Sequence, residues 1–570
     1  MPLARQRSTG TSAAGRNARL SSHPSRSPAQ GAQPADSQRN APASRVAAPF
    51  IAPTEGAAGP DTGETHHPRP AVGAPPGQFT DGLHAELIAA GKAAYCHRDD
   101  HAFVLTLAPT SEDRQKKLIR MTIDSAEKFA IITSFNVNPA KDHDPEKISG
   151  TMFAILESLA RKQHDKDFSF VLFYNDNKLQ TNAAISAVVG QNVTTNMSLR
   201  SSSRTNATTT WPAVVKAYNR QQTDASLKIT RPLCNLYFVA AKAKGVAGSH
   251  HNKFCINDRG VAATLGASLA NKTKDSWMDG GCVTLSQPLA ARQRDYFLDE
   301  LIGRHTVHGG QLQVNGEGEL VMEKMKDLSR IHALGAVDIE SPLDQAGPHK
   351  EQAVARLRDS LAQAGVEFDG AAHKVLWVQN TSSGYKNMFS TRGHIEGKPI
   401  GQVMSRFFSG AQPGETINIV NKTIGSEGMA LITDALARGC NVNVLINEDN
   451  RTALERAARK FFAHPASSSV GTLNLRHFAP SETLAAAQNF NTAEQAVGHA
   501  KNYILERQDG SSIVMTGSYN LDGQSHYRSN ENLMLFETQG HAVKEALFDD
   551  LYNGCTSPIS TFSATAPRHR

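Results

Sequence analysis

The alternation of apolar and polar positions predicts strand–helix–strand units in the chain. Residues 129–135 (Phe-Ala-Ile-Ile-Thr-Ser-Phe) and 168–174 form continuous apolar runs that are typical of buried strands. Between them, residues 148–162 have helical spacing, and residues 103–107 predict a further short strand. Strands that are joined through a helix favour a parallel sheet.

The same order of elements returns in the second part of the chain. Residues 416–420 and 441–446 read as strands, and residues 426–438 read as a helix that ends at Gly439. We therefore interpret the chain as an internal duplication. The predicted fold class is α/β, with two similar α/β/α halves.

The composition sets the limits of these halves. Residues 1–82 are rich in Ser, Pro, Ala and Arg and lack aliphatic periodicity, which predicts a disordered tail. This tail could be a plain flexible segment, an organellar transit peptide or the leader of a type III secreted effector, and it lacks the apolar region of a classical secretory signal. We expect the first half at 83–316 and the second at 371–555.

The segments outside these units read as connections. Residues 175–231 are rich in Asn, Thr and Ser, which predicts a long loop or insertion over the site. Residues 317–370 read as a charged, helical connector between the halves, and residues 556–570 read as a loose tail.

The net charge of +6 is unevenly distributed. Residues 1–80 contain eight Arg and four acidic residues, which leaves about +2 for the rest of the chain. A nearly neutral body lacks the broad basic surface of a nucleic-acid binder, so nucleic acid is a disfavoured partner.

Cysteine spacing and hydropathy exclude several other classes. Cys255, Cys282 and Cys440 lie in or beside apolar runs, which indicates reduced, buried thiols rather than a disulfide framework. The sequence contains no run of eighteen apolar residues, so we predict no transmembrane helix. The chain has no P-loop, no dinucleotide fingerprint and no metal-ligand spacing, so we predict no cofactor and no metal.

Two short motifs point to chemistry on phosphate. His251-x-Lys253 is followed by four residues and Asp258, and His499-x-Lys501 is followed by four residues and Glu506. On a strand, His and Lys two positions apart point to the same side. An imidazole beside an ammonium group suits attack on a phosphoryl group. Two copies allow one His to attack while the other protonates the leaving group.

The paired motifs resemble the signature of the phospholipase D superfamily. In that family each His-x-Lys motif is followed by Gly-Ser-x-Asn, and residues 517–525 look especially like the bacterial branch that includes cardiolipin synthases. The resemblance covers most of the chain beyond about residue 110. It implies a phospholipase D fold, in which two halves pack about a pseudo-twofold axis and share one site.

By resemblance, His251 would be the nucleophile that forms a phosphohistidine, and His499 would be the general acid and then the base. The reverse order stays open. Lys253 and Lys501 would hold the phosphoryl oxygens. A nucleophilic imidazole works best when its second nitrogen donates to an acid. The remaining residues that the resemblance implies are Asp258, Glu506, Ser268, Asn271, Asp279, Ser518, Asn520 and Glu531, of which Asp279 and Glu531 are the candidate acids.

The sequence departs from the family pattern at two places. Glu506 replaces the motif Asp, at a strand end where its role is expected to be turn-forming. In the first half, Gly266-Ala267-Ser268-Leu269 puts Leu where Asn belongs, and Ser268 or Asn271 would have to substitute. His250 should face away from His251 on a strand, so we interpret it as structural.

Three functions compete. The first is a phosphodiesterase or phosphatidyltransferase that acts on phospholipids at a membrane surface, because water or an alcohol can resolve a covalent intermediate. The second is a nuclease of the same superfamily. The third is an effector-type binding protein with weak or no catalysis. Both motifs in one chain predict a monomer, located in the bacterial cytoplasm or secreted into a host cell.

Overall fold

The computed structural model places most of the chain beyond residue 77, and residues Pro68–Arg570 form one compact unit. Residues 1–77 of the predicted tail at 1–82 lie outside the described residues, and its last part, 78–82, belongs to helix α1 (Gln78–Ala89). The structure describes residues 78–110, 112–135, 137, 140–141, 144–175, 203–242, 249–266, 268–269, 277–304, 306–341, 352, 372–380, 398–463, 470–487, 497–527 and 529–564.

The first half is built on a mixed sheet with helices on it. Its helices are α1 (Gln78–Ala89), α2 (Glu112–Asp124), α3 (Gly150–Lys162), α5 (Ser203–Gln221), α6 (Gln287–Tyr296), the π-helix η4 (Phe297–Ile302) and α7 (Ser329–His332), with 3-10 turns η1 (Ala93–Tyr95), η2 (Ala225–Leu227) and η5 (Ala333–Ala336). Its strands are β1 (Cys96–Thr110), β2 (Phe129–Ser134), β3 (Ala140–Lys141), β4 (Asp144–Ile148), β5 (Ser169–Asn175), β6 (Asn235–Lys242), β7 (Ser249–His250), β8 (Phe254–Asn257), β9 (Val261–Leu265), β10 (Trp277–Leu285), β11 (Thr306–Val314) and β12 (Leu320–Lys324).

The second half has the same kind of architecture. Its strands are β13 (Ala372–Asn380), β14 (Thr416–Asn421), β15 (Asn441–Ile446), β16 (Leu473–His477), β17 (Val497–Gly498), β18 (Asn502–Glu506), β19 (Ser511–Gly517), β20 (Ser529–Gln539) and β21 (Ser560–Phe562). Its helices are α9 (Pro399–Gly410), α10 (Ser426–Ala437), α11 (Glu448–Ala463), α12 (Glu482–Ala487), α13 (Gly523–Tyr527), α14 (Ala542–Lys544), the π-helix η10 (Glu545–Asp549) and α15 (Asp550–Gly554).

The two halves repeat one order of strand pairing. In the first half β2 pairs parallel with β5 and antiparallel with β8, which continues through β9 to β10. In the second half β14 pairs parallel with β15 and antiparallel with β18, which continues through β19 to β20. This repetition is what a duplicated unit produces, so the α/β fold class with two similar halves agrees with the structure.

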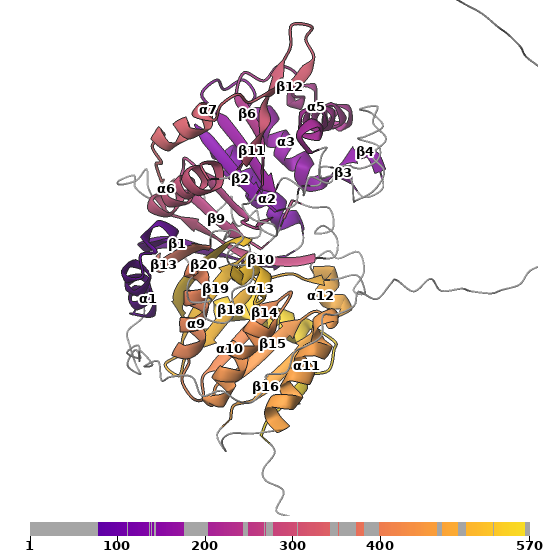
Figure 1. Cartoon of the computed structure of the whole chain (residues 1–570). Helices are drawn as coiled ribbons and strands as arrows, with labels where there is room; N and C mark the ends of the chain where they lie inside the picture. The colour runs from indigo at the N-terminus through magenta and orange to yellow at the C-terminus, as the bar shows by residue number, and fades with distance from the viewer. Residues whose placement is uncertain are drawn as a thin grey trace, which may run out of the picture. The chain divides into compact units, whose positions relative to one another are not determined.

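The strands of both halves join into one sheet. β10 pairs with β1, β1 with β13, and β13 with β20, all antiparallel. Figure 1 shows these four strands where the purple first half meets the orange and yellow second half. The first half therefore continues into the second through main-chain hydrogen bonds.

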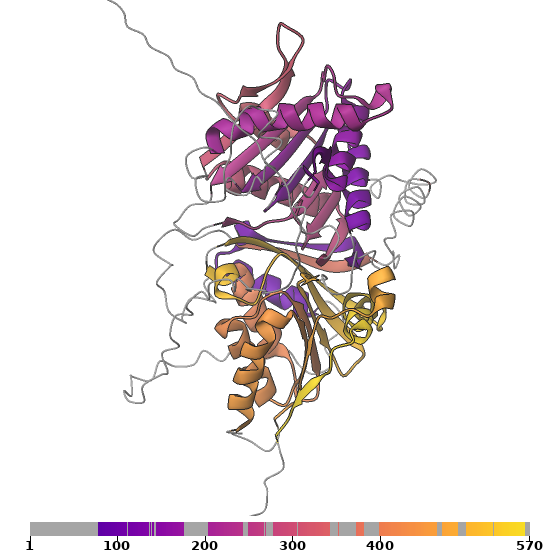
Figure 2. The same cartoon turned by 90° about the vertical axis from the view of Figure 1, so that its right-hand side faces the viewer.

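Three apolar clusters form the core. One lies under α2, α3 and α5 and includes Leu118, Ile155 and Trp211, and another lies under the second-half helices. The third takes buried side chains from both halves, among them Phe129 and Ile504. Figure 2 shows the helices of each half lying over its strands.

Most predicted elements are confirmed close to their expected bounds. β2 and β5 match the first pair of apolar runs, and α3 lies between them with the Ser149 hydroxyl accepting from the Met152 amide as its N-cap. β14, α10 and β15 match the second unit, and Gly439 after α10 has the positive φ of 88° that favours glycine.

Three predictions of irregular or helical structure are wrong for the described residues. Within the polar stretch 175–231, residues 203–221 form helix α5, because Trp211, Val214 and Tyr218 pack into the core on one face. The connector contains strand β12, which pairs with β11, alongside only short helical turns in its described part. In the C-terminal tail, β21 pairs with β16.

Two further expectations concerned reduced, buried thiols and the lack of a transmembrane helix. All six cysteines are buried free thiols, and burial raises the pKa of Cys255 to about 12. None of the helices among the described residues is long and apolar enough to cross a membrane.

Candidate active site

Each His-x-Lys triplet lies in a break between two strands. His251 and Lys253 lie between β7 and β8, and His499 and Lys501 lie between β17 and β18. The expectation that His and Lys share a continuous strand is therefore wrong. Their side chains still come together, since the Lys501 Nζ lies 2.8 Å from the Nδ1 of His499.

Each triplet is held by the opposite half of the chain. The short strand β7 pairs parallel with β20, and β17 pairs parallel with β10. The amide of His251 donates to the Asn530 carbonyl at 2.9 Å, and the amide of His499 donates to the Met278 carbonyl at 2.8 Å. The two motifs are thereby placed against β20 and β10.

This crossed pairing gives each histidine an acid from the other half. His251 Nδ1 lies 2.8 Å from Glu531 Oε2, and His499 Nδ1 lies 2.5 Å from Asp279 Oδ1. An acid at Nδ1 fixes the imidazole orientation, and when that acid is a carboxylate it holds the ring proton on Nδ1 and leaves Nε2 unprotonated. The structure therefore brings together four of the expected residues as two histidine–acid pairs.

The two motif lysines are fully buried beside the histidines. The Lys253 ammonium donates to the main-chain carbonyl oxygen of His251 at 2.9 Å, and the Lys501 ammonium donates to that of His499. Lys501 also lies 3.7 Å from Asp279 Oδ1. Burial lowers the pKa of Lys253 to about 7 and that of Lys501 to about 8, partly opposed by the nearby acids.

The environment of both imidazoles favours their neutral form. Burial, followed by the charges of Lys253 and Lys501, lowers the pKa of His251 well below its usual value. Burial also lowers the pKa of His499 to about 3, although the Asp279 carboxylate opposes this shift. A neutral imidazole with a free Nε2 is the form that can attack phosphorus.

The two acids have different surroundings. Glu531 accepts from the Ser518 hydroxyl at 2.5 Å and from the Ser525 hydroxyl at 3.0 Å, and burial raises its pKa to about 8 against the opposing charge of Lys253. For Asp279, burial is outweighed by the interactions with His499 and Lys501, which lower its pKa to about 2. Its second oxygen, Oδ2, has no hydrogen-bond partner among the described residues.

The strand register gives the first-half turn a different alignment from the one expected. The Ser518 amide donates to the carbonyl of Asn532, the residue after Glu531, and the Gly266 amide donates to the carbonyl of Gly280, the residue after Asp279. Gly266 is thus the counterpart of Ser518. By the same count Ser268, which is buried, is the counterpart of Asn520, so Leu269 does not occupy the Asn position.

The last acid of each motif lies away from the histidines. Asp258 accepts from the amides of Glu127 and Phe129 at 3.0 and 3.1 Å and so fixes the turn that leads into β2. Glu506 pairs with Lys544 at 2.9 Å and accepts from Asn418 at 2.8 Å. Neither is part of the histidine cluster.

The remaining expected residues divide into three cases. Asn520 lies on the turn after β19, and its buried Oδ1 has no hydrogen-bond partner among the described residues. Asn271 lies outside the described residues. His250 is buried, with its ring 5.4 Å from that of Phe173 and its Nδ1 2.9 Å from the Asn530 side chain, as a structural residue would be.

Three residues of the site were not predicted. The Asn532 amide group accepts from the Lys253 backbone at 3.1 Å and donates to its carbonyl at 3.2 Å. Phe135 packs its ring edge-on against His251 at 4.8 Å. Lys422 contributes a positive charge that lowers the pKa of both histidines. Asn532 stands next to Glu531 in the sequence and could have been found there, whereas Phe135 and Lys422 carry no motif.

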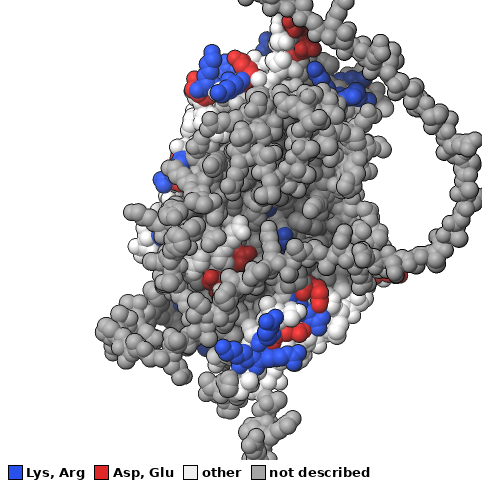
Figure 3. All heavy atoms as spheres, turned by 45° about the vertical axis from the view of Figure 1, so that its right-hand side comes forward, with Lys and Arg blue, Asp and Glu red and all other residues white. Residues whose placement is uncertain are grey.

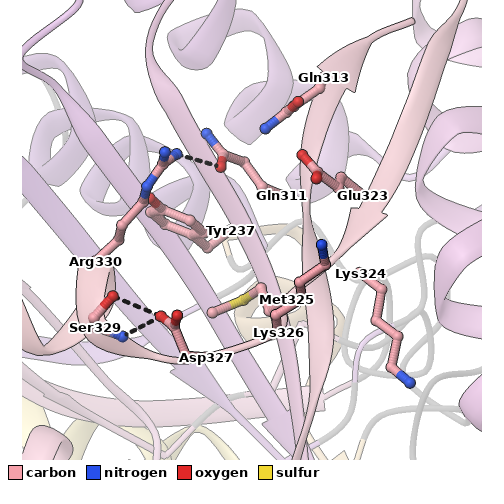
Figure 4. A pocket seen from close by; sticks show the side chains of 10 residues that line it. All are labelled: Tyr237, Gln311, Gln313, Glu323, Lys324, Met325, Lys326, Asp327, Ser329 and Arg330. Carbon is pink, nitrogen blue, oxygen red and sulfur yellow. Dashed lines mark hydrogen bonds between the residues drawn. The ribbon is translucent and has the colours of Figure 1, made fainter.

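Neither the charged surface drawn in Figure 3 nor the pocket drawn in Figure 4 extends this site. On the face drawn in Figure 3, the described Lys and Arg side chains lie in mixed groups with Asp and Glu, with no broad basic area among them. A pocket at β6, β11 and β12 contains none of the motif residues, and its polar side chains bond to one another, such as Arg330 to Gln311 (Figure 4). It is lined by Tyr237, Gln311, Gln313, Glu323, Lys324, Met325, Lys326, Asp327, Ser329 and Arg330.

Comparison with known families agrees with the geometry. Residues 405–549 match the family described as "Cardiolipin synthase, PLD-like domain". This segment is a phospholipase D-like domain. It includes His499, Lys501 and Glu531, and it covers much of the second half. No curated protein sequence matches the chain.

Solved structures with some likeness to the whole chain, which contains this phospholipase D-like domain, include three enzymes. Phosphatidylserine synthase from Haemophilus influenzae is 14% identical, with a TM-score of 0.48 over 84% of this chain and 91% of that one. Yeast tyrosyl-DNA phosphodiesterase is 10% identical, with a TM-score of 0.37 over 76% and 88%. Polyphosphate kinase from Porphyromonas gingivalis is 10% identical, with a TM-score of 0.34 over 76% and 44%.

Proposed function

We propose that this protein is a phosphodiesterase of the phospholipase D type that cleaves or transfers phosphatidyl groups through a phosphohistidine. The observation that carries the proposal is the pair of imidazoles, each held at Nδ1 by a buried acid from the opposite half. Two buried ammonium groups lie beside them. The phospholipase D-like domain at 405–549 supports the same class of reaction.

In the first step, His251 Nε2 attacks phosphorus. A P–N bond forms, the P–O bond to the head-group alcohol breaks, and His499 gives a proton to the departing oxygen. A phosphodiester anion bound beside His499 raises the pKa of that imidazole, because the anion offsets the lysine charges. Lys253 and Lys501 hold the phosphoryl oxygens and stabilise the charge that develops on them.

In the second step, His499 takes a proton from water or from an acceptor alcohol. The oxygen of that molecule attacks phosphorus and the P–N bond breaks, which restores His251. Water gives phosphatidic acid, and an alcohol gives a new phosphatidyl ester. The acid–base role of His499 thus reverses between the two steps.

The deciding experiment measures phosphatidic acid and phosphatidylethanol released from mixed phospholipid vesicles with ethanol present. Wild type should give product, and His251→Ala and His499→Ala should each lose at least about a hundredfold in rate. His164→Ala is the matched control, because His164 is an exposed histidine after α3. Product from neither wild type nor control would overturn the lipid assignment.

The same variants assign the two roles. With substrate labelled at phosphorus and an alkaline quench, His499→Ala should retain label on the protein, because His251 can still attack. His251→Ala should retain none. The opposite pattern would make His499 the nucleophile. If lipids fail, cleavage of single- or double-stranded DNA by wild type alone would support the nuclease alternative, which the mixed surface charge disfavours.

A further inference from the structure

The two halves of the site differ at one equivalent position. In the first half β2 pairs antiparallel with β8, and in the second half β14 pairs antiparallel with β18. Counted from the motif lysine of each half, these two pairings have the same register. β2 ends at Ser134 and β14 ends at Asn421. The next residues are Phe135 and Lys422, which therefore occupy corresponding places beside the two His-x-Lys triplets.

On the His251 side this position is aromatic. The Phe135 ring lies with its edge toward the His251 ring, at 4.8 Å between centroids and an angle of 70°. The Lys253 ammonium lies 5.8 Å from the centroid of the same ring. Phe135 therefore forms an apolar wall against one histidine and contributes no charge that an anion could bind.

On the His499 side the same position is cationic. Val420 pairs with Asn502, so Lys422, two residues further on, lies beside the segment that carries Lys501. The Lys422 charge lowers the pKa of His251, His499, Lys253 and Lys501. Its ammonium is thus within electrostatic range of all four motif side chains, whose two histidines are paired with the acids Asp279 and Glu531.

We propose that Lys422 binds a second anionic group of the substrate, carried by the head group on the His499 side of the scissile phosphate. Phe135 packs against the uncharged part of the substrate next to His251. The two His-x-Lys triplets present the same imidazole and ammonium groups from both sides of a bound phosphate. The difference between Lys422 and Phe135 gives that phosphate a preferred direction, since a charge favours an anion at only one end.

This inference rests on the proposed function and names its substrate class: a phospholipid whose head-group alcohol carries its own negative charge. His499 protonates the leaving alcohol, so the head group departs on the side where Lys422 lies. A head group with a phosphate gains a charge-assisted contact there, whereas a quaternary ammonium group meets repulsion. Lys422 would thus determine the specificity for the charge of the head group.

The test uses two lipids that differ by one terminal phosphate, dihexanoyl phosphatidylglycerol and dihexanoyl phosphatidylglycerol phosphate. Both are kept below their micellar concentration, so that the charge of a membrane surface plays no part. Wild type should have the higher kcat/KM for the phosphate-bearing lipid. Lys422→Met should lower this preference at least about tenfold, mainly through KM, and Lys422→Arg should restore most of it.

The control variant is Lys460→Ala, which removes one exposed positive charge from the end of α11 and should leave the preference unchanged. An equal loss on both lipids in Lys422→Met would mean a structural role and overturn the inference. So would an unchanged preference. If wild type turns over neither lipid but releases product from the mixed vesicles, or turns over both lipids without preference, this inference alone is overturned. No product from either substrate would overturn the proposed function as well.

Discussion

At the scale of single residues, the two histidine–acid pairs are alike in geometry and unlike in charge. Glu531 has two serine donors and a raised pKa, whereas Asp279 has a lowered pKa and one oxygen without a partner among the described residues. Both acids were predictable as candidates from their place after the turn. Their crossed assignment was not, because spacing within one half carries no information on which half supplies the partner.

We expect Glu531→Gln to change how stability depends on pH. The pKa of Glu531 is about 8 in the folded protein against 4.5 for an ordinary Glu, so the folded state binds more protons between these values. Stability should therefore fall as pH rises through this window, and the Gln variant should lack that part of the fall. Urea midpoints at pH 5 and pH 7.5 measure it. The histidines that do not contact Glu531 contribute equally to both proteins, and identical slopes would contradict the raised pKa.

A second expectation separates the acids that face the histidines from those that do not. Asp279→Asn should lower kcat at least about a hundredfold, because it removes the charge that orients His499. Glu506→Gln is the matched change and should stay within about threefold, because Glu506 pairs with Lys544 on the far end of β18. Similar losses of kcat in both variants would mean that Glu506 also contributes to the active site.

At the scale of elements, pairing register decides which residues correspond. Counting along the motif placed Leu269 at the Asn position, but the hydrogen bonds of the turn after β9 make Gly266 the counterpart of Ser518. The strands with continuous apolar runs were predictable because burial on both faces leaves a plain signal. α5 was missed since its apolar residues, such as Trp211 and Tyr218, stand among Asn and Thr. β12 and β21 were missed because short edge strands have almost no pattern of their own.

Gly266 tests this register. A Cβ at this position would lie 2.9 Å from the Gly280 carbonyl oxygen and 3.0 Å from Asp279 Oδ1, so Gly266→Ser should displace Asp279. We expect a loss of about 1–3 kcal/mol in unfolding free energy together with at least about tenfold lower activity. Gly316→Ala has open space around it and should change stability by less than about 0.5 kcal/mol. Full activity in Gly266→Ser would contradict this close packing, because it would mean that a side chain fits at this position without displacing Asp279.

At the scale of the whole described unit, the halves share a sheet and a core. β1, β13, β10 and β20 pair across the junction, and one apolar cluster takes side chains from both sides. Trp377 on β13 is fully buried in this cluster, 5.6 Å from the Tyr296 ring. The duplication was predictable from the repeated order of elements, but this continuity was not, because β1 and β13 are far apart in the sequence.

We therefore expect both halves to unfold in one transition. Tryptophan fluorescence and far-ultraviolet circular dichroism should give the same denaturant midpoint. Trp377→Ala should lower the unfolding free energy by about 3–5 kcal/mol and shift both signals together. Two separate midpoints, in wild type or in the variant, would mean that the halves are independent domains.

The exchange of acids between the halves has a consequence for how such a chain can change over generations. Neither half holds a complete histidine–acid pair of its own. His251 depends on Glu531, 280 positions away, and His499 depends on Asp279, 220 positions away. Recombination within the region between them breaks both dependencies at once unless the incoming half offers a matching acid. We therefore expect that one half can be exchanged for that of another protein only together with the acid that its histidine needs.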